Sequence, residues 1–61
     1  MISTIKFVYK DKGIHMIKTK DAFVLDNRRK ELRIGESVFC LKNVESVTVT
    51  NKTGSLDIYK S

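Results

Sequence analysis

Apolar residues alternate with polar ones over most of the chain, in short runs separated by turn-forming residues. This period of two is typical of strands that bury one face. No segment keeps the 3.6-residue spacing of a helix over roughly ten positions, and the one helical alternative is a single turn at residues 42–46. The pattern predicts an all-β fold, a small antiparallel meander of five to seven short strands, either a curled sheet or a small barrel.

The C-terminal third predicts the clearest hairpin. Residues 51–54 (Asn-Lys-Thr-Gly) form a suitable loop, with glycine late, where a positive φ is often needed. Apolar side chains then share one face of the two strands, as a half-buried hairpin requires. The predicted pairs are Thr50 with Ser55, Val49 with Leu56 and Val47 with Ile58.

Two further turns organise the middle of the chain. Residues 27–30 suit a hairpin loop, and Gly35-Glu36 suits a two-residue turn with glycine first. The resulting register pairs Asp26 with Glu31, Leu25 with Leu32, Phe23 with Ile34 and Leu32 with Phe39. Three successive strands then direct one apolar set inward, namely Phe23, Leu25, Leu32, Ile34, Phe39 and Leu41.

The N-terminal register is less constrained by the sequence. Residues 11–13 (Asp-Lys-Gly) suit a three-residue hairpin loop with a glycine bulge. In the return strand, Met16 and Ile17 both compete for the position facing Phe7. Only Lys20-Asp21 separates this strand from the next, which predicts one long bent strand over residues 14–25.

A chain of 61 residues makes one domain, residues 1–61, with a thin core. One cysteine excludes an internal disulfide, and one histidine with it cannot form a four-ligand zinc site. The fold is therefore either an economical single-core unit or one completed by a second copy. The lone thiol, and the absence of a membrane-length apolar run or signal peptide, predict a cytoplasmic protein.

The sequence offers little to a catalytic mechanism. His15 lies in a predicted strand without a serine, cysteine or carboxylate at motif spacing, so a surface histidine is the simpler interpretation. Cys40 alternates with Phe39 and Leu41, which places it on the outer face or in a secondary apolar patch. We expect no enzyme activity, no cofactor, no metal and no small-molecule substrate.

Net charge is +5, and the sharpest local feature is the basic loop at residues 27–33. Its arginine forks suit phosphate oxygens, although charge runs on loops are usually only solvated. Lys10, Lys12, Lys18 and Lys20 would supply the surrounding field, and the candidate contacts are Arg28, Arg29, Lys30 and Arg33. Because the phenylalanines are needed in the core, only Tyr9 and Tyr59 remain for base stacking.

A second candidate surface lies on the face opposite the core. Val8, Val24, Val38 and Cys40 all alternate out of the predicted apolar stripe. Scattered exposed valines are normal, but four on neighbouring strands also fit a patch that contacts another protein or another copy. An unpaired edge strand offers a second route to association.

The pattern over residues 24–60 resembles bacterial pleckstrin-homology-like domains. A strand ends in Leu41, a short bend carries Val44, and a strand-loop-strand unit follows with Val47 and Ile58, while residues 24–28 (Val-Leu-Asp-Asn-Arg) are similar to the family's turn. The closing helix of that family has no counterpart here. The resemblance implies an interaction scaffold, and the Lys-, Ile- and Asn-rich composition is similar to that of an AT-rich Gram-positive bacterium or its phage.

These observations predict a non-catalytic interaction module that self-associates or docks on a protein partner. It would act as an accessory or inhibitory factor of bacterial or phage origin, through the outer valines or an edge strand. The alternative is a nucleic-acid-binding module that uses the basic loop.

Overall fold

A computed structural model describes residues 2–61 as seven β-strands, and this part of the chain contains no helix. The all-β prediction is therefore confirmed. Because these residues form no helix, none of them builds a helix that could cross a membrane. The strands are β1 (Ser3–Tyr9), β2 (Ile14–Thr19), β3 (Phe23–Asp26), β4 (Glu31–Ile34), β5 (Ser37–Cys40), β6 (Val44–Asn51) and β7 (Gly54–Lys60).

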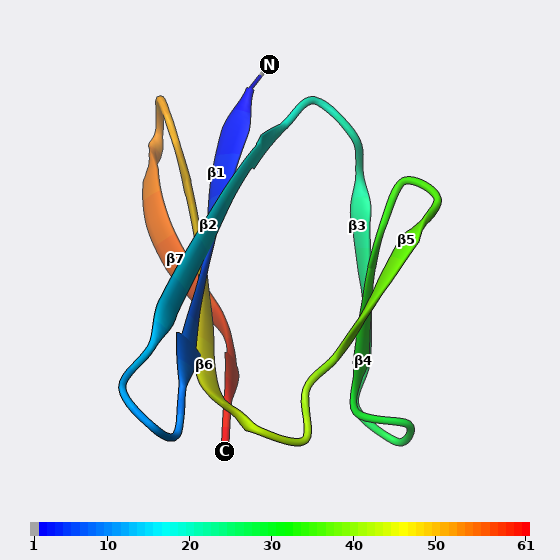
Figure 1. The fold of residues 1–61 in the computed structure, drawn as a ribbon. Coiled ribbons are helices and arrows are strands. Elements are labelled where there is room, and N and C mark those ends of the chain that lie inside the picture. Colours follow the sequence, from blue (N-terminus) through cyan, green and yellow to red (C-terminus); the bar gives the residue numbers. More distant parts are fainter. Residues whose placement is uncertain (1) are drawn as a thin grey trace.

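The strands form two separate antiparallel sheets rather than one closed barrel (Figure 1). One sheet has the order β2-β1-β6-β7 and the other the order β3-β4-β5. The four-stranded sheet is not a simple meander, because β1 lies between β2 and β6. Ile5 pairs with Val49 and Phe7 with Val47, which brings the two ends of the chain side by side.

The three-stranded sheet has the register that the sequence predicts. Leu25 faces Leu32 across β3 and β4, and Leu32 faces Phe39 across β4 and β5. Gly35 has a φ of 58°, as expected for glycine at the first position of the turn. Its amide donates a hydrogen bond of 3.3 Å to the carbonyl of Ala22, which ties this turn to the start of β3.

The N-terminal hairpin differs from the prediction in its register and in its loop. Phe7 lies opposite His15, so neither Met16 nor Ile17 holds that position. The residue with positive φ is Lys12, at 77°, rather than Gly13. The Lys12 amide donates to the Tyr9 carbonyl at 2.9 Å, and the Tyr9 amide donates to the Gly13 carbonyl at 2.8 Å. The three-residue loop is therefore residues 10–12, one residue earlier than predicted, and this shift moves the register.

The predicted long strand over residues 14–25 is interrupted. β2 ends at Thr19 and β3 begins at Phe23, and each belongs to a different sheet. The Asp21 amide donates to Thr19 Oγ1 at 3.0 Å, a local side-chain bond that replaces strand pairing at this point. The chain therefore crosses from one sheet to the other instead of bending within one. The other crossing, at Lys42–Asn43, is a simple turn that leads into β6 and not a helical turn.

The C-terminal hairpin follows the predicted register only near its loop. Thr50 pairs with Ser55 and Val49 with Leu56, but Val47 then faces Tyr59 instead of Ile58. The register shifts between Val47 and Thr48, so Ile58 is an extra residue on β7. Such a bulge reverses the alternation of side chains beyond it, and Tyr59 enters the core as a result.

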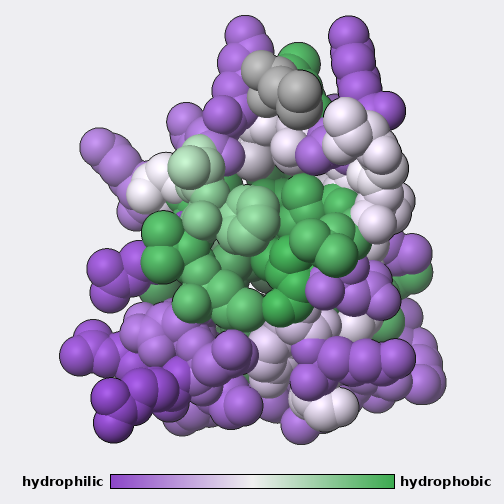
Figure 2. All heavy atoms as spheres, turned by 180° about the vertical axis from the view of Figure 1, so that it is seen from behind, coloured by the Kyte–Doolittle hydropathy of each residue, from purple (hydrophilic) through white to green (hydrophobic). Residues whose placement is uncertain are grey.

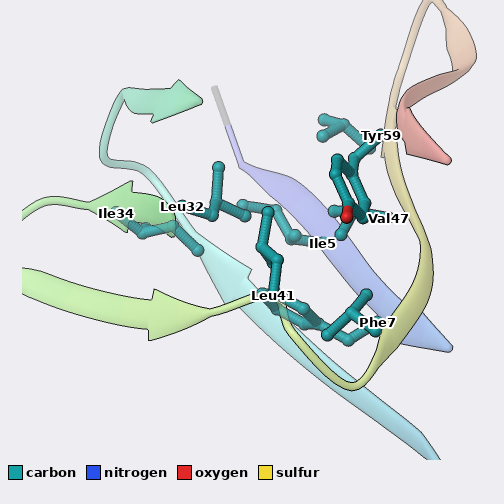
Figure 3. Packing of buried hydrophobic residues seen from close by; sticks show 9 residues of the cluster. Ile5, Phe7, Leu32, Ile34, Leu41, Val47 and Tyr59 are labelled. Carbon is teal, nitrogen blue, oxygen red and sulfur yellow. The ribbon is translucent and has the colours of Figure 1, made fainter. Parts of the chain in front are cut away.

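The core lies between the two sheets (Figure 3). Ile5 and Phe7 from β1 face Leu32 and Ile34 from β4, and Leu41 fills the space between them. The buried set is Ile5, Phe7, Leu32, Ile34, Leu41, Val44, Val47, Val49 and Tyr59. Burying large apolar side chains at about 1.5–3 kcal/mol each is the main force that holds the sheets together.

Two residues predicted to point inward are exposed. Phe23 is 37% exposed and Leu56 is 67% exposed. They belong to β3 and β7, which are edge strands of the two sheets. An inward direction buries a side chain only where the opposite sheet extends over it, and at these edges it does not.

Candidate binding surface

The outer face of the three-stranded sheet brings parts of both predicted surfaces together. Arg33 on the central strand pairs with Val24 on one side and with Val38 on the other. Residues directly opposite in antiparallel strands project from the same face. The valines are 63% and 55% exposed, and the Arg33 side chain is 55% exposed. An exposed arginine thus lies between two exposed valines.

The four residues of the predicted valine patch are divided between the sheets. Cys40 is exposed on β5, two positions beyond Val38 and on the same face. Val8 lies on β1, in the other sheet, where it is half-buried and pairs with Ile14. Because alternation along the sequence cannot tell which sheet a strand joins, it cannot separate Val8 from the other three.

Three arginines converge beside this face. Arg28 and Arg29 from the β3–β4 loop, together with Arg33 from β4, line an open hollow of about 580 Å³. Val24 and Asp26 complete its lining. An apolar residue and an acidic residue thus line the hollow together with the arginines, so the hollow is mixed in character and not purely basic.

The loop that carries the arginines is organised by Asp26. Its Oδ1 accepts hydrogen bonds from the amides of Arg28 and Arg29, both at 3.1 Å. Such bonds from an aspartate to backbone amides two and three positions ahead stabilise a tight turn. Lys30 then takes a φ of 56°, which returns the chain to β4. The arginine side chains are thus presented from a backbone held by a side chain at its base.

Lys30 is separated from the arginines. Its Nζ lies 5.6 Å from the centre of the Tyr59 ring on β7, a cation–π contact. Its carbonyl accepts a hydrogen bond of 2.8 Å from the amide of Leu41. Lys30 therefore packs toward the other sheet, and the structure places it apart from the three arginines.

Tyr59 is also excluded from its predicted role as a base-stacking platform. It is 8% exposed and belongs to the buried core. The bulge at Ile58, which no local sequence signal announces, turns it inward. Tyr9 is half-buried against the same core. With Tyr59 buried, no pair of exposed tyrosines forms a surface for stacking bases.

A carboxylate lies within the basic face. Glu31 Oε1 is 3.9 Å from Arg33 Nη2, an ion pair longer than a hydrogen bond. The same Oε1 atom is buried and receives no hydrogen bond. Glu31 pairs laterally with Asp26 and with Cys40. Two carboxylates thus offset part of the positive charge of the three arginines.

The lysines predicted to supply the surrounding field are dispersed. Lys10 and Lys12 lie in the β1–β2 loop, at the same end of the molecule as the β3–β4 loop, and Lys20 lies at the opposite end (Figure 1). Lys12 Nζ contacts Glu45 Oε2 at 3.5 Å, which uses part of its charge locally. Lys18 lies on β2, opposite Thr4. These four lysines are therefore divided between the two ends of the molecule and β2.

The two residues considered for catalysis lie apart. His15 is exposed on β2, and its ring centre is 6.2 Å from that of Phe7. Cys40 lines a different hollow of about 390 Å³, with Tyr9, Lys10, Asp11 and Asn43. Within residues 2–61 no three His, Cys, Asp or Glu side chains are grouped as metal ligands.

No family model, curated protein or solved structure matches this chain. The resemblance to pleckstrin-homology-like domains and the bacterial or phage origin therefore stay predictions.

Proposed function

We propose that this protein is a non-catalytic binding module whose outer three-stranded face docks on another protein. The observation that carries the proposal is the cross-strand set Val24, Arg33 and Val38, in which an arginine lies between two exposed valines. Arginine is enriched where proteins meet, because its flat guanidinium covers apolar surface and pairs with carboxylates. The partner surface would be partly apolar and partly acidic.

The charges on this face favour a protein partner over a nucleic-acid partner. Asp26 and Glu31 lie beside the three arginines, so a phosphate backbone would meet carboxylates as well as guanidinium groups. A protein surface can place its own donors opposite those carboxylates, which a phosphate chain cannot. The exposed valines also gain more from an apolar partner than from phosphates.

The test is a displayed library of random peptides, selected against the purified protein, with the enriched peptides measured by calorimetry. We expect sequences that combine Asp or Glu with aliphatic or aromatic residues. Val38→Ser should weaken their binding roughly tenfold, the value of about 1.5 kcal/mol for one buried valine. Met16→Ser is the matched control, because Met16 is 58% exposed on the other sheet.

Equal losses in Val38→Ser and Met16→Ser would contradict docking on this face, and so would the absence of any enriched peptide. Neither substitution changes the charge, so a general electrostatic effect cannot imitate the expected result. Circular dichroism of both variants checks that the sheets remain folded.

A second candidate function is nucleic-acid binding, which the convergence of Arg28, Arg29 and Arg33 on one hollow favours. It predicts binding of labelled DNA or RNA, by fluorescence anisotropy, that weakens steeply with salt. The double change of Arg28 and Arg29 to alanine would abolish this binding, whereas Val38→Ser would leave it intact. That pair of results would place the second candidate first.

A further inference from the structure

The side of the molecule between β3 and β7 is open and apolar. Phe23 from β3, Val49 from β6, and Leu56 and Ile58 from β7 line a groove of about 270 Å³. Leu56 is 67% exposed there, the largest exposed fraction among the large apolar side chains of the described residues. Figure 2 shows a continuous apolar area on the back of the molecule, bordered by polar residues.

The groove is uncharged, although the chain as a whole carries +5. Its remaining lining residues, among those described, are Asn51, Thr53, Gly54 and Ser55. An acidic protein or a nucleic acid would gain no ion pair here. Two copies of the same basic chain, by contrast, repel each other least where neither presents a charge. The chemistry of this groove therefore fits a second copy of the chain.

The total exposed surface of the chain also supports association with a second copy. The accessible surface is 4589 Å² for a mass of 7.0 kDa, whereas a monomeric protein of this mass exposes about 4,000 Å². The excess is roughly 500–600 Å². A typical interface buries about 800 Å² on each partner, and small ones bury less. The surplus therefore matches one side of a small dimer interface.

The edge of β7 supplies the means of association. Among residues 2–61, β7 bonds to β6 on one side only, and no described strand pairs with its other edge. An antiparallel strand added to this edge extends the four-stranded sheet and directs alternate side chains to the same side as Leu56, toward Phe23. When the added strand is β7 of a second copy, the contact is self-complementary and closes as a two-fold dimer.

We propose that two copies of this chain form a two-fold dimer across the open side, with their β7 edges paired antiparallel. Leu56 and Ile58 of each copy then cover the groove beside Phe23 of the other. This interface is separate from the outer three-stranded face, so the dimer keeps two such faces free.

Sedimentation equilibrium over a wide concentration range tests the proposal. The wild-type chain is expected to move from 7.0 kDa toward twice that mass. Leu56→Lys should raise the dimer dissociation constant more than roughly tenfold, because it places two like charges in an uncharged contact. The side chain is largely exposed, so the monomer should keep its fold, which circular dichroism checks.

Met16→Lys is the matched control, because it adds the same charge far from β7. Met16 is 58% exposed and lies on β2, the strand at the opposite edge of the same sheet. It should dimerise like the wild type. A wild-type chain that stays monomeric up to about millimolar concentration overturns the proposal, as does equal weakening in both variants. Val38→Ser should dimerise like the wild type in sedimentation equilibrium. This result would distinguish dimerisation through β7 from peptide binding on the outer three-stranded face.

Discussion

The two sheets are held together by different kinds of pairing. In the three-stranded sheet every strand pairs with its neighbour in the sequence, through the β3–β4 loop and the Gly35–Glu36 turn. In the four-stranded sheet the central contact joins β1 to β6, which come from opposite ends of the chain. Local loops therefore determine the first sheet, whereas the second depends on contacts that form only in the folded molecule.

The two sheets also bury their residues differently. β1 and β6 contribute five of the buried core residues, namely Ile5, Phe7, Val44, Val47 and Val49. The strands of the three-stranded sheet contribute Leu32 and Ile34, and both of its edge strands expose a valine on the outer face. The four-stranded sheet thus contributes most of the buried core residues, and we expect it to contribute most of the stability, whereas the three-stranded sheet presents most of the candidate binding surface.

The largest expected effect comes from a matched pair of phenylalanines, one in each sheet. The Phe7 ring is 1% exposed and lies 5.2 Å from that of Phe39, which is half-buried. Phe7→Ala should cost about 3–5 kcal/mol, which unfolds so small a domain. Phe39→Ala should cost less, because part of its ring is already in water. Urea unfolding followed by circular dichroism measures both.

Equal losses in the two variants would contradict the division of stability between the sheets. A chain that stays folded with Phe7→Ala would contradict it as well.

The sequence predicts the three-stranded sheet well because its signals are local. Gly35 marks one turn, Asp26 and the polar residues after it mark the other, and the alternation of apolar residues then leaves one register. Part of the candidate surface can be predicted in the same way, because this register places Val24, Arg33 and Val38 on one face.

The strand order and register of the four-stranded sheet cannot be predicted from the sequence, for a physical reason. β6 has an extra residue, Glu45, where it pairs with Val8 and Tyr9 of β1, and β7 has the extra residue Ile58. These two bulges change which side chains face inward, and neither has a glycine to mark it. Tyr59 is buried only because of the second bulge. The place of β1 between β2 and β6 depends on the packing of both sheets, which no local pattern encodes. The crossing of the chain at Lys20–Ala22 is hidden in the same way.

An intermediate effect is expected at the turn of the three-stranded sheet. Gly35 has a φ of 58°, and a Cβ there would lie 2.6 Å from Asp21 Oδ2. Gly35→Ala should cost about 1–2 kcal/mol, mostly from the left-handed backbone, because the Asp21 side chain can move. Gly13→Ala is the comparison, since Gly13 does not have a positive φ. Thermal unfolding of both variants measures the difference, and a larger loss at Gly13 would show that the local turn is not what holds this sheet.

The smallest expected effect concerns Asp26, at the base of the β3–β4 loop that carries Arg28 and Arg29. Asp26 lies opposite Glu31, and like charges in that position repel by a few tenths of a kcal/mol. Asp26→Asn keeps an acceptor for the amides of Arg28 and Arg29 and removes the repulsion, so stability should rise slightly. Asp26→Ala loses both bonds and should cost about 1 kcal/mol. Chemical unfolding of the two variants compares them, and equal effects would rule out a role for the acceptor.

The place of β1 has a consequence for the protein during its synthesis. A ribosome that has finished β1 at Tyr9 must add every residue up to Asn51 before β6 is complete. At ~5–20 residues per second this takes several seconds, during which Ile5 and Phe7 have no partner from β6. The β1–β2 hairpin alone is only marginally stable in water. The four-stranded sheet can therefore form only after residues 44–60 have been made, and until then the apolar side chains of β1 lack the partners that bury them.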